Sequence, residues 1–368
     1  MKIVILCTQL EGGGAQRAAY RLSGELNKLG NDAENWFFYK KRDNFKNLSV
    51  TRVFLDRPIK SILDYLKISF KYYRAIKKER PDAIIAFTHY SNVLGLFLAY
   101  CAGIKIRIAS HRNPSWGDMS KLLQKVDSLF ASAGIYTDIT AVSKSTKESF
   151  KYYPRNIYDS ILVVNNGLPR TFNKISQDEA RGVFGLPKEV KILGTIGRLS
   201  PQKNHKFLIE MAKKLPDNII LVIAGDGELK EETKSIIGKY GLKERVILLG
   251  EISYEKIPTY LKCLDIFLMP SLFEGLSNAL IEAMAAGIPV IASNIDSQKD
   301  VIISNDGIEC GILLDIDDHI PWITAIQNLV DNKEKMEFYK EVALLRVRDF
   351  TVEKMAQDFL SVINKHKV

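Results

Sequence analysis

Short apolar runs alternate with amphipathic segments along almost the whole chain. Strands that are apolar on both faces and are joined by helices are typical of a parallel sheet with helices on each side. The alternation therefore predicts an α/β fold built from doubly wound sheets. We expect strands at residues 2–6, 83–87, 106–110, 139–142, 191–197, 219–225, 246–249, 266–269 and 290–292.

The alternation starts afresh after Pro169. The 368 residues of the chain suffice for two domains of ordinary size. We therefore place one domain at 1–168 and a second at 169–350, joined around residues 165–170. A last helix within 351–368 either finishes the second domain or crosses back to the first.

One strand–loop–helix unit, at residues 268–289, carries the strongest functional signal. Its helix is expected to begin near Ser277 or Asn278 and to end at Gly287. The first N–H groups of a helix have no partner within it, so this helix start is a candidate anion site. Two carboxylates flank it, Glu274 in the loop and Glu282 in the helix. An anion site beside carboxylates that can bind hydroxyls suits a sugar attached to a phosphate.

Two basic residues follow the first strand of the second domain, at an edge where α/β sheets bind ligands. Arg198 presents a fork that clamps two phosphate oxygens, and Lys203 supplies a compact second charge. Together they could hold a diphosphate and stabilise the charge on it as it leaves. The alternative interpretation is two solvated loop residues.

A run of three glycines, Gly12, Gly13 and Gly14, follows the first strand of the chain. Glycine lets a backbone approach a ligand closely, and the next helix begins with unpaired N–H groups. The spacing is not that of the G-x-G-x-x-G fingerprint, which weakens a dinucleotide dehydrogenase as an interpretation. A tight turn without a ligand is the alternative.

Several of these motifs together resemble one enzyme family. Glu274, within Phe-Glu-Gly, and Glu282, followed by Gly-x-Pro, resemble the E-x7-E signature of retaining glycosyltransferases with the GT-B fold. More closely, the chain is similar to glycosyltransferase family 4. Four other segments match in the family's order, namely Gly-Gly-Gly-Ala-Gln-Arg at 12–17, Asn-Asn-Gly at 165–167, Gly-Arg-x4-Lys-Asn at 197–204 and Ala-Gly-Asp-Gly at 224–227.

The resemblance implies two Rossmann-like domains that face each other across a cleft, with the donor bound mainly by the second. Arg198 and Lys203 then bind the donor diphosphate. Glu274 contacts sugar hydroxyls and Glu282 holds the ribose. The resemblance implies no cofactor and no metal, because cationic groups and helix dipoles replace a metal. The implied donor-binding residues are Gly13, Gly14, Arg198, Lys203, Glu274, Gly275, Leu276, Ser277 and Glu282.

The group that takes the acceptor proton is less well defined by the resemblance. Many relatives place a His in the loop after the strand at 106–110, where this chain reads Ser-His-Arg-Asn-Pro. Comparison with such relatives indicates that Arg112 rather than His111 occupies that position. His89, after the preceding strand, is a further candidate, and Glu274 completes the catalytic set. A surface or hydrogen-bonding role is the alternative for each His.

The formal net charge of +9 lies in the first 80 residues, which hold 17 Lys and Arg and 8 Asp and Glu. The densest basic segment, at 67–80, has aromatic residues between its cations. Such a helix either lies on an anionic membrane surface or is a solvated face whose aromatics pack inward. No motif that reads bases accompanies the charge, so we expect no nucleic acid partner.

The remaining features favour a cytoplasmic protein. The four cysteines form no C-x-x-C pair, which fits a reducing compartment. The N-terminus lacks the pattern of a signal peptide, and the longest apolar stretch, 93–104, is too short to span a bilayer. We expect any membrane association of the protein to be peripheral, at the inner face of the cell membrane.

The sequence therefore predicts a retaining glycosyltransferase. It moves a hexose or N-acetylhexosamine from a nucleoside diphosphate sugar, by preference a UDP-sugar, to a glycan or lipid-linked acceptor in bacterial surface polysaccharide or glycoconjugate synthesis. A nucleotide-sugar epimerase of related fold and a non-catalytic GT-B partner subunit are the alternatives.

Overall fold

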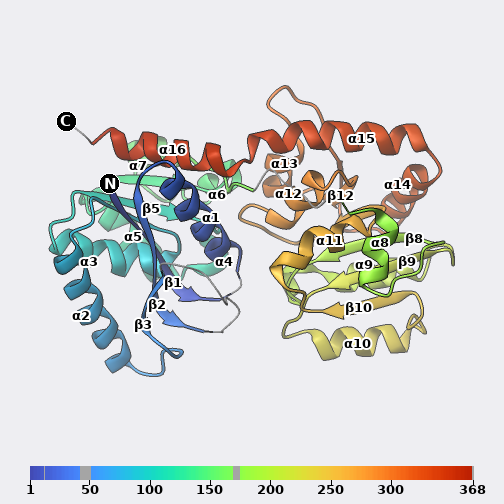
Figure 1. Ribbon diagram of the computed structural model, residues 1–368, viewed down its shortest axis with the longest axis horizontal. Helices are drawn as coiled ribbons and strands as arrows, with labels where there is room; N and C mark the ends of the chain where they lie inside the picture. The colour runs from blue at the N-terminus through green and yellow to red at the C-terminus, as the bar shows by residue number, and fades with distance from the viewer. Residues whose placement is uncertain (12, 42–50, 169–174, 367–368) are drawn as a thin grey trace. The chain divides into compact units, whose positions relative to one another are not determined.

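A computed structural model describes residues 1–11, 13–41, 51–168 and 175–366. It divides into two compact units, unit 1 with Met1–Leu168 and Phe350–Val368 and unit 2 with Pro169–Asp349. Each unit contains a parallel β-sheet with helices packed on it (Figure 1). The predicted α/β fold with two sheets is therefore confirmed. Gly12 of the glycine run and residues 169–170 of the predicted junction lie outside the described residues.

The described strands of unit 1 pair in the order β3-β2-β1-β4-β5-β6-β7. All of these pairs are parallel, and β1 lies between β2 and β4, with Ile5 opposite both Asn35 and Ile85. The strands are β1 (Lys2–Leu10), β2 (Asp32–Lys40), β3 (Thr51–Leu55), β4 (Ala83–Ala86), β5 (Ile106–His111), β6 (Asp138–Ala141) and β7 (Leu162–Val163).

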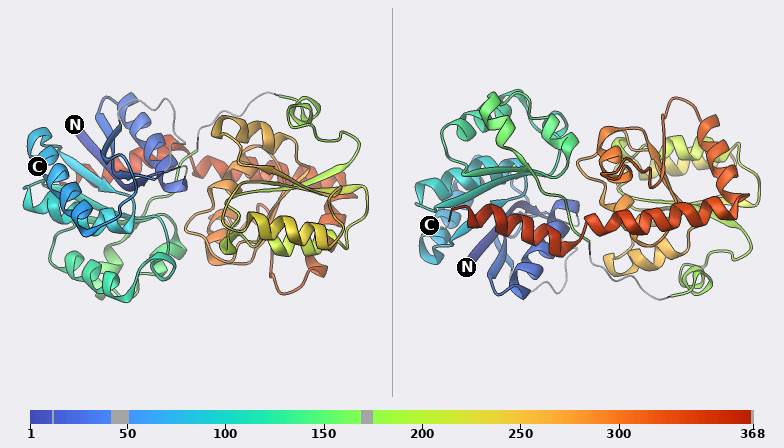
Figure 2. Two further views of the ribbon diagram at one scale, coloured as in Figure 1. Left: turned by 90° about the horizontal axis from the view of Figure 1, so that it is seen from below. Right: turned by 90° about the horizontal axis from the view of Figure 1, so that it is seen from above.

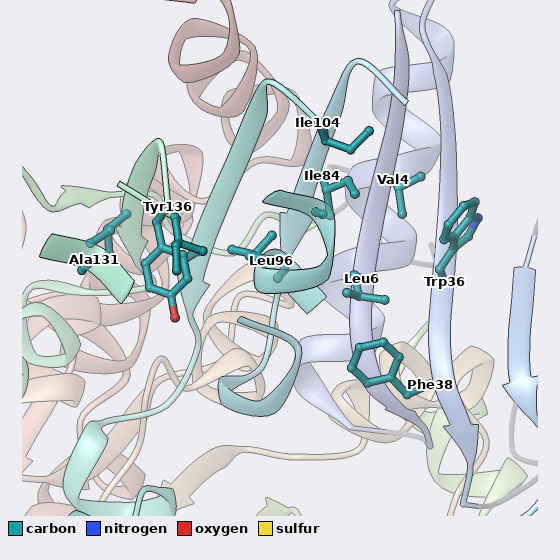
Figure 3. Close-up of a cluster of buried hydrophobic side chains, with 14 of the residues drawn as sticks. Val4, Leu6, Trp36, Phe38, Ile84, Leu96, Ile104, Ala131 and Tyr136 are labelled. Carbon is teal, nitrogen blue, oxygen red and sulfur yellow. The ribbon is translucent and has the colours of Figure 1, made fainter. Parts of the chain in front are cut away.

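Helices cover both faces of this sheet. On one face, α1 (Gly14–Lys28) and α16 (Val352–Asn364) pack side by side against β1 and β4 through Leu22 and Phe359 (Figure 2). On the other, Tyr72 and Leu96 pack with Leu6 and Trp36 in a second apolar cluster (Figure 3). The helical segments on that side and its rim are α2 (Ile62–Glu79), the π-helix η1 (Ser91–Gly95), α3 (Leu96–Cys101), α4 (Ser115–Asp118), α5 (Lys121–Ser132), α6 (Lys144–Glu148) and α7 (Arg155–Ser160).

The last described helix, α16, belongs to unit 1 although all of unit 2 precedes it in the sequence. Its start is capped by Thr351, whose hydroxyl accepts from the Lys354 N–H. Backbone hydrogen bonds join Leu168 N–H to Phe350 O (2.8 Å) and Val352 N–H to Leu168 O (3.2 Å). The polypeptide therefore returns to unit 1 beside the point at which it left.

The described strands of unit 2 pair in parallel in the order β10-β9-β8-β11-β12-β13. One face is packed by Phe207, Ile237 and Trp322. The strands are β8 (Lys191–Ile196), β9 (Ile219–Ala224), β10 (Val246–Gly250), β11 (Ile266–Met269), β12 (Val290–Ser293) and β13 (Ile312–Leu314). The helical segments are α8 (Gln177–Val183), η2 (Pro201–Lys203), α9 (His205–Ala212), α10 (Lys230–Lys239), η3 (Tyr254–Lys256), α11 (Ile257–Lys262), α12 (Asn278–Ala285), α13 (Asp296–Ile302), α14 (Ile320–Val330), α15 (Lys333–Arg346) and η4 (Val347–Asp349).

The sequence prediction missed four strands, β2, β3, β7 and β13. β2 reads Asp-Ala-Glu-Asn-Trp-Phe-Phe-Tyr-Lys, so polar residues interrupt the apolar run that marks a buried parallel strand. Two donors of this strand find partners in the structure, because Asn35 Nδ2 donates to Ser23 Oγ of α1 (2.6 Å) and Trp36 Nε1 donates to Glu34 (2.7 Å). Tertiary partners, and not strand composition, allow this segment to be buried.

Candidate functional site

The strand order of unit 2 reverses direction at one point, between β8 and β11. The chain proceeds from β8 to β9 on one side, whereas β11 lies on the other. The chain therefore leaves β8 and β11 toward opposite sides of the sheet, with the loops at their carboxyl ends next to each other. Doubly wound sheets bind their ligands at such a point. The two loops are residues 197–204 and 270–277, which contain most of the predicted donor-binding residues.

An ion pair between a partly exposed lysine and a buried carboxylate joins these two loops. Lys203 Nζ lies 2.6 Å from Glu274 Oε1, and the Glu274 residue is only 8% exposed. Ser271 Oγ also donates to Oε1 (2.9 Å), and Gln202 Nε2 lies 3.3 Å from Oε2. Gln202 further ties the loops through its backbone carbonyl, which accepts from the Leu272 N–H (2.8 Å). Glu274 is thus held by three donors, as an oriented carboxylate requires.

Close backbone packing fixes the position of Lys203. Its stem lies on Gly197, where a Cβ would stand 3.0 Å from the Lys203 Cε. Gly197 in turn contacts Gly225, which has φ of +148°, and a Cβ on Gly225 would lie 1.8 Å from the Gly197 carbonyl oxygen. The Ala-Gly-Asp-Gly turn at 224–227 therefore packs against the loop after β8, at Gly197. Arg198 leaves the same loop with an exposed side chain.

The predicted helix after Glu274 is α12, Asn278–Ala285. Gly275, Leu276 and Ser277 are buried at its start, and the Ser277 side chain makes no capping hydrogen bond. The N-terminal end of a helix carries partial positive charge, so this end favours an anion. Glu282 is buried within α12, 6% exposed. Two carboxylates thus frame an electropositive helix start.

The corresponding reversal in unit 1 lies between β1 and β4. Gly13 and Gly14 lie after β1, where Gly13 is the N-cap of α1 and Gly14 its first residue. His89 follows β4 and is 7% exposed. Thr8 and Thr88 join the two strand ends through a hydroxyl–hydroxyl contact of 2.6 Å. The glycine loop and His89 therefore flank the ligand-binding edge expected for this sheet.

His111 is the last residue of β5 and not part of the loop after it. It pairs in register with Ala141 and its ring is fully buried, with the Phe150 ring centroid at 3.9 Å. Burial, aided by the neighbouring Arg112 guanidinium, lowers the pKa of His111 to about 3. The ring is therefore neutral at physiological pH.

Arg112 is likewise buried, 6% exposed. Its guanidinium carbon lies 3.9 Å from the centroid of the Phe87 ring, and Nη1 donates to Asn166 Oδ1 (3.1 Å). Burial lowers the pKa of Arg112 to about 9. Asn166 belongs to the Asn-Asn-Gly motif, so Arg112 links that motif to the end of β5.

Within the described residues, no group of three or more His, Cys, Asp or Glu is placed to hold a metal ion. None of the helices in this part of the chain is both long enough and apolar enough to cross a bilayer.

Comparison with protein families tests the resemblance. Residues 176–344, which lie within unit 2, match the family model of the glycosyl transferases group 1. This segment of the chain is therefore a glycosyl transferases group 1 domain. The matched segment contains both loops that meet at the Lys203–Glu274 pair.

Two relatives of this transferase are named as sugar transferases with undecaprenol-linked substrates. It is 29% identical to the UDP-Gal:alpha-D-GlcNAc-diphosphoundecaprenol alpha-1,3-galactosyltransferase of Escherichia coli, over 74% of this chain and 72% of the relative. It is 28% identical to the GalNAc-alpha-(1->4)-GalNAc-alpha-(1->3)-diNAcBac-PP-undecaprenol alpha-1,4-N-acetyl-D-galactosaminyltransferase of Campylobacter jejuni, over 100% of this chain and 99% of the relative.

Solved structures share the fold of this transferase over nearly the whole chain. The crystal structure of Anabaena Alr3699/HepE in complex with UDP and glucose has a TM-score of 0.84, with 20% identity and 99% of each chain covered. The apo form of the lipopolysaccharide outer core galactosyltransferase WaaB has a TM-score of 0.72, again with 20% identity and 99% of each chain covered. The predicted GT-B fold is therefore confirmed.

Sequence reasoning missed several residues that the structure adds to these sites. Gln202 and Ser271 hold Glu274, and both lie close in sequence to predicted residues, Gln202 next to Lys203 and Ser271 in the loop before Glu274. Asp127 and Tyr153 approach His111 from segments without any motif. Gln202 and Ser271 could have been found by their position near motif residues. Asp127 and Tyr153 could not, because only the tertiary structure brings them to His111.

Proposed function

We propose that this transferase moves a hexosyl or N-acetylhexosaminyl group from a UDP-sugar to a glycan or lipid-linked acceptor, with retained anomeric configuration. The observation that carries the proposal is the Lys203–Glu274 pair at the β8/β11 reversal of unit 2. It places a cation, a carboxylate and a helix start together, which matches the phosphate and hydroxyl groups of a nucleotide sugar.

The donor diphosphate is proposed to bind Lys203, Arg198 and the start of α12, near Gly275, Leu276 and Ser277. These groups stabilise the charge that develops on UDP as its bond to the sugar breaks, which is the role that a metal ion has in other transferases. Glu274 then accepts hydrogen bonds from sugar hydroxyls and Glu282 from the ribose. Uracil as the base is supported by the UDP in the HepE complex and by the UDP-Gal in the name of the E. coli relative.

The acceptor is proposed to bind unit 1, with Gly13, Gly14 and His89 at its ligand-binding edge and with Arg112 and His111 behind them. Relatives named for undecaprenol-diphosphate acceptors support a lipid-linked acceptor in bacterial glycan synthesis. Unit 1 has an open pocket of about 460 Å³, lined among others by Lys41, Lys60, Tyr39 and Tyr65, where such a diphosphate is proposed to bind. Lys60 offers a cation to an anion there, whereas Lys41 already pairs with Glu11 (3.0 Å).

Ligand binding tests the donor site. UDP at a concentration of 100 times its Kd is expected to stabilise the folded state by about 2.7 kcal/mol, because only the native state binds it. Thermal unfolding with UDP, with UDP-sugars and with uridine as the control measures this effect. Uridine lacks the diphosphate, so we expect a much smaller shift. A protein whose melting temperature responds to no UDP-, GDP-, ADP- or TDP-sugar would contradict the proposal.

Helix α2 is proposed to dock this transferase on an anionic membrane. Its inward face, with Ile68 and Tyr72, packs on the sheet. Its outward face is apolar in the first half, where Ile62, Leu63, Leu66 and Phe70 are each more than 60% exposed. In the second half that face is basic, with exposed Arg74, Lys77 and Lys78. This division suits a helix that inserts one half among acyl chains and sets the other against phosphates.

Vesicle sedimentation tests this surface. Replacing Leu66 and Phe70 together by Ser is expected to lower binding to vesicles with anionic lipid at least about tenfold, because burial of one such side chain contributes about 1.5–3 kcal/mol. Leu345→Ser is the matched control, since Leu345 is 57% exposed on α15 of unit 2. High salt should weaken the wild-type protein's binding by screening its lysines. Wild-type protein that stays in the supernatant at low salt would refute the surface.

A further inference from the structure

A line of three hydroxyls crosses the strand reversal of unit 1, between the ends of β1 and β4. Among the described residues, β1 pairs with β4 as far as Leu6, which lies opposite Ala86, whereas β1 itself continues to Leu10. Beyond that last pair, the Thr8 N–H donates to the hydroxyl oxygen of Thr88 (3.0 Å). Side chains therefore take over from the backbone ladder at the edge where doubly wound sheets bind their ligands.

Hydrogen bonds join the three hydroxyls. Thr8 Oγ1 lies 2.6 Å from Thr88 Oγ1, and Thr88 Oγ1 lies 2.8 Å from the Oγ of Ser91, the first residue of η1. Ser91 Oγ also donates to the backbone carbonyl of Thr88 (2.8 Å), which can only accept. A hydroxyl has one proton and two lone pairs. Because the Ser91 proton lies toward that carbonyl, Ser91 Oγ accepts from the Thr88 hydroxyl, and Thr88 Oγ1 accepts from the Thr8 hydroxyl.

Every contact in the line is a hydrogen bond when the protons point this way. The two lone pairs of Ser91 Oγ accept from the N–H (3.0 Å) and the hydroxyl of Thr88. The two lone pairs of Thr88 Oγ1 accept from the N–H and the hydroxyl of Thr8. In the reverse direction the Ser91 proton would point to Thr88 Oγ1, and Ser91 Oγ would face the Thr88 carbonyl oxygen at 2.8 Å with no proton between them. The Thr8 proton is therefore assigned to the contact with Thr88.

Thr8 Oγ1 is left with two lone pairs and no proton to donate to a ligand. In the part of the chain that the structure describes, no donor contacts this oxygen, and Thr8 is partly exposed, shortly before the glycine loop. Such an oxygen accepts from a hydroxyl or an amide N–H. The oxygens of an ionised phosphate or carboxylate only accept as well, so Thr8 Oγ1 repels them.

We propose that Thr8 is a specificity-determining residue whose hydroxyl oxygen binds a hydroxyl or acetamido N–H of the acceptor sugar, and that Thr88 and Ser91 are positioning residues that keep its proton turned inward. The inference rests on the proposed function, in which unit 1 binds the acceptor. It adds an orientation to that function. The sugar of a lipid-linked acceptor lies at Thr8, and its diphosphate lies elsewhere on unit 1.

Neutron diffraction from crystals of the deuterated, ligand-free chain tests the direction of the line, because it locates the deuterium atoms of ordered hydroxyls. We expect the Thr8 deuterium between Thr8 Oγ1 and Thr88 Oγ1, and the Ser91 deuterium between Ser91 Oγ and the Thr88 carbonyl. A Thr8 deuterium that points away from Thr88 overturns the proposal. This measurement needs no substrate, so a chain that transfers no sugar contradicts the proposed function and leaves the assignment of the hydroxyl line intact.

Acceptor kinetics test the ligand, with UDP-galactose and a GlcNAc-α-diphosphate ester of decanol as probes, after the substrates in the name of the E. coli relative. Thr8→Val keeps the shape of the side chain but removes both lone pairs. We expect the KM for the acceptor to rise about tenfold, the effect of leaving one donor unpaired, with kcat and UDP affinity unchanged. Thr8→Ser keeps the hydroxyl and should restore KM. A rise in Thr8→Val that Thr8→Ser does not reverse overturns the proposal, because loss of packing alone predicts that result.

Two further variants separate the contact from its support. In Ser91→Ala the Thr88 hydroxyl loses its acceptor and turns to Thr8, whose proton then points outward. The KM for the acceptor should rise as in Thr8→Val. Thr140→Val is the matched control, because Thr140 also donates to a neighbouring hydroxyl, Ser110 Oγ (2.7 Å), but in β6. Its KM should equal that of the wild type. An unchanged KM in Ser91→Ala, or an equal rise in Thr140→Val, overturns the proposal.

Discussion

Lys203→Ala is expected to lower kcat for sugar transfer by about 10²- to 10³-fold, the usual effect of removing one preorganised donor to a developing charge. The ammonium lies at the end of the β8 loop, 2.6 Å from Glu274, and so can contact a diphosphate and a carboxylate together. Its removal takes away charge that the leaving UDP requires. Initial rates with a saturating UDP-sugar, together with UDP affinity from calorimetry, measure the two effects separately.

The domain should remain folded in this variant, because Glu274 keeps its hydrogen bonds from Ser271 and Gln202. Lys206→Ala is the matched control. Lys206 is three residues further along, its side chain is 61% exposed, and it lies near Glu210 on α9. We expect near-normal transfer from it, since exposed pairs of this kind contribute about 0–1 kcal/mol. Equal turnover by both variants would sink the assignment of Lys203 to the donor site.

Gly225→Ala is expected to destabilise unit 2 by about 3 kcal/mol or more and to abolish UDP binding. The residue has φ of +148°, and an added Cβ would lie 1.8 Å from the Gly197 carbonyl oxygen. Backbone strain and overpacking each cost about 1–3 kcal/mol. The β8 loop must move to relieve the overlap, and it carries Lys203 away from Glu274. Denaturant unfolding and UDP calorimetry measure the two consequences.

A second glycine separates the overlap from the backbone strain. Gly241 also has positive φ (+67°), but nothing lies within 4 Å of its added Cβ. Gly241→Ala should therefore cost only about 1–2 kcal/mol and leave UDP binding intact. If the two variants lost stability equally and both bound UDP, close packing of Gly225 on Gly197 would not position the loop.

The motifs of unit 2 could be predicted because each one is local. The segment from β11 to α12 is an apolar strand, a short loop and a helix that ends before Gly287. All of these signals lie in one stretch of sequence. The meeting of Lys203 with Glu274 could not be predicted from spacing, since it depends on β11 pairing with β8. Only the resemblance to a family assigned these residues to one site. The roles of the proposed site residues remain predictions.

Unit 1 was harder to predict for a different physical reason. Asp127 lies on an amphipathic helix among Lys and Ser residues and has the composition of a solvated position. Its buried carboxylate accepts hydrogen bonds from three tyrosines. Tyr136 lies just before β6, and Tyr152 and Tyr153 lie just before α7. Polar residues in a core are defined by such partners, and the partners are distant in sequence.

The return of α16 to unit 1 constrains how the polypeptide can fold during its synthesis. Val352, Ala356 and Phe359 complete the apolar layer over β1 and β4, beside Leu22 of α1. The ribosome makes these residues after the whole of unit 2, so unit 1 emerges with one layer of its core open to water. Unit 2 can close its own core first, although domains generally fold in the order of synthesis. The unit that is made first is therefore the one that finishes folding last.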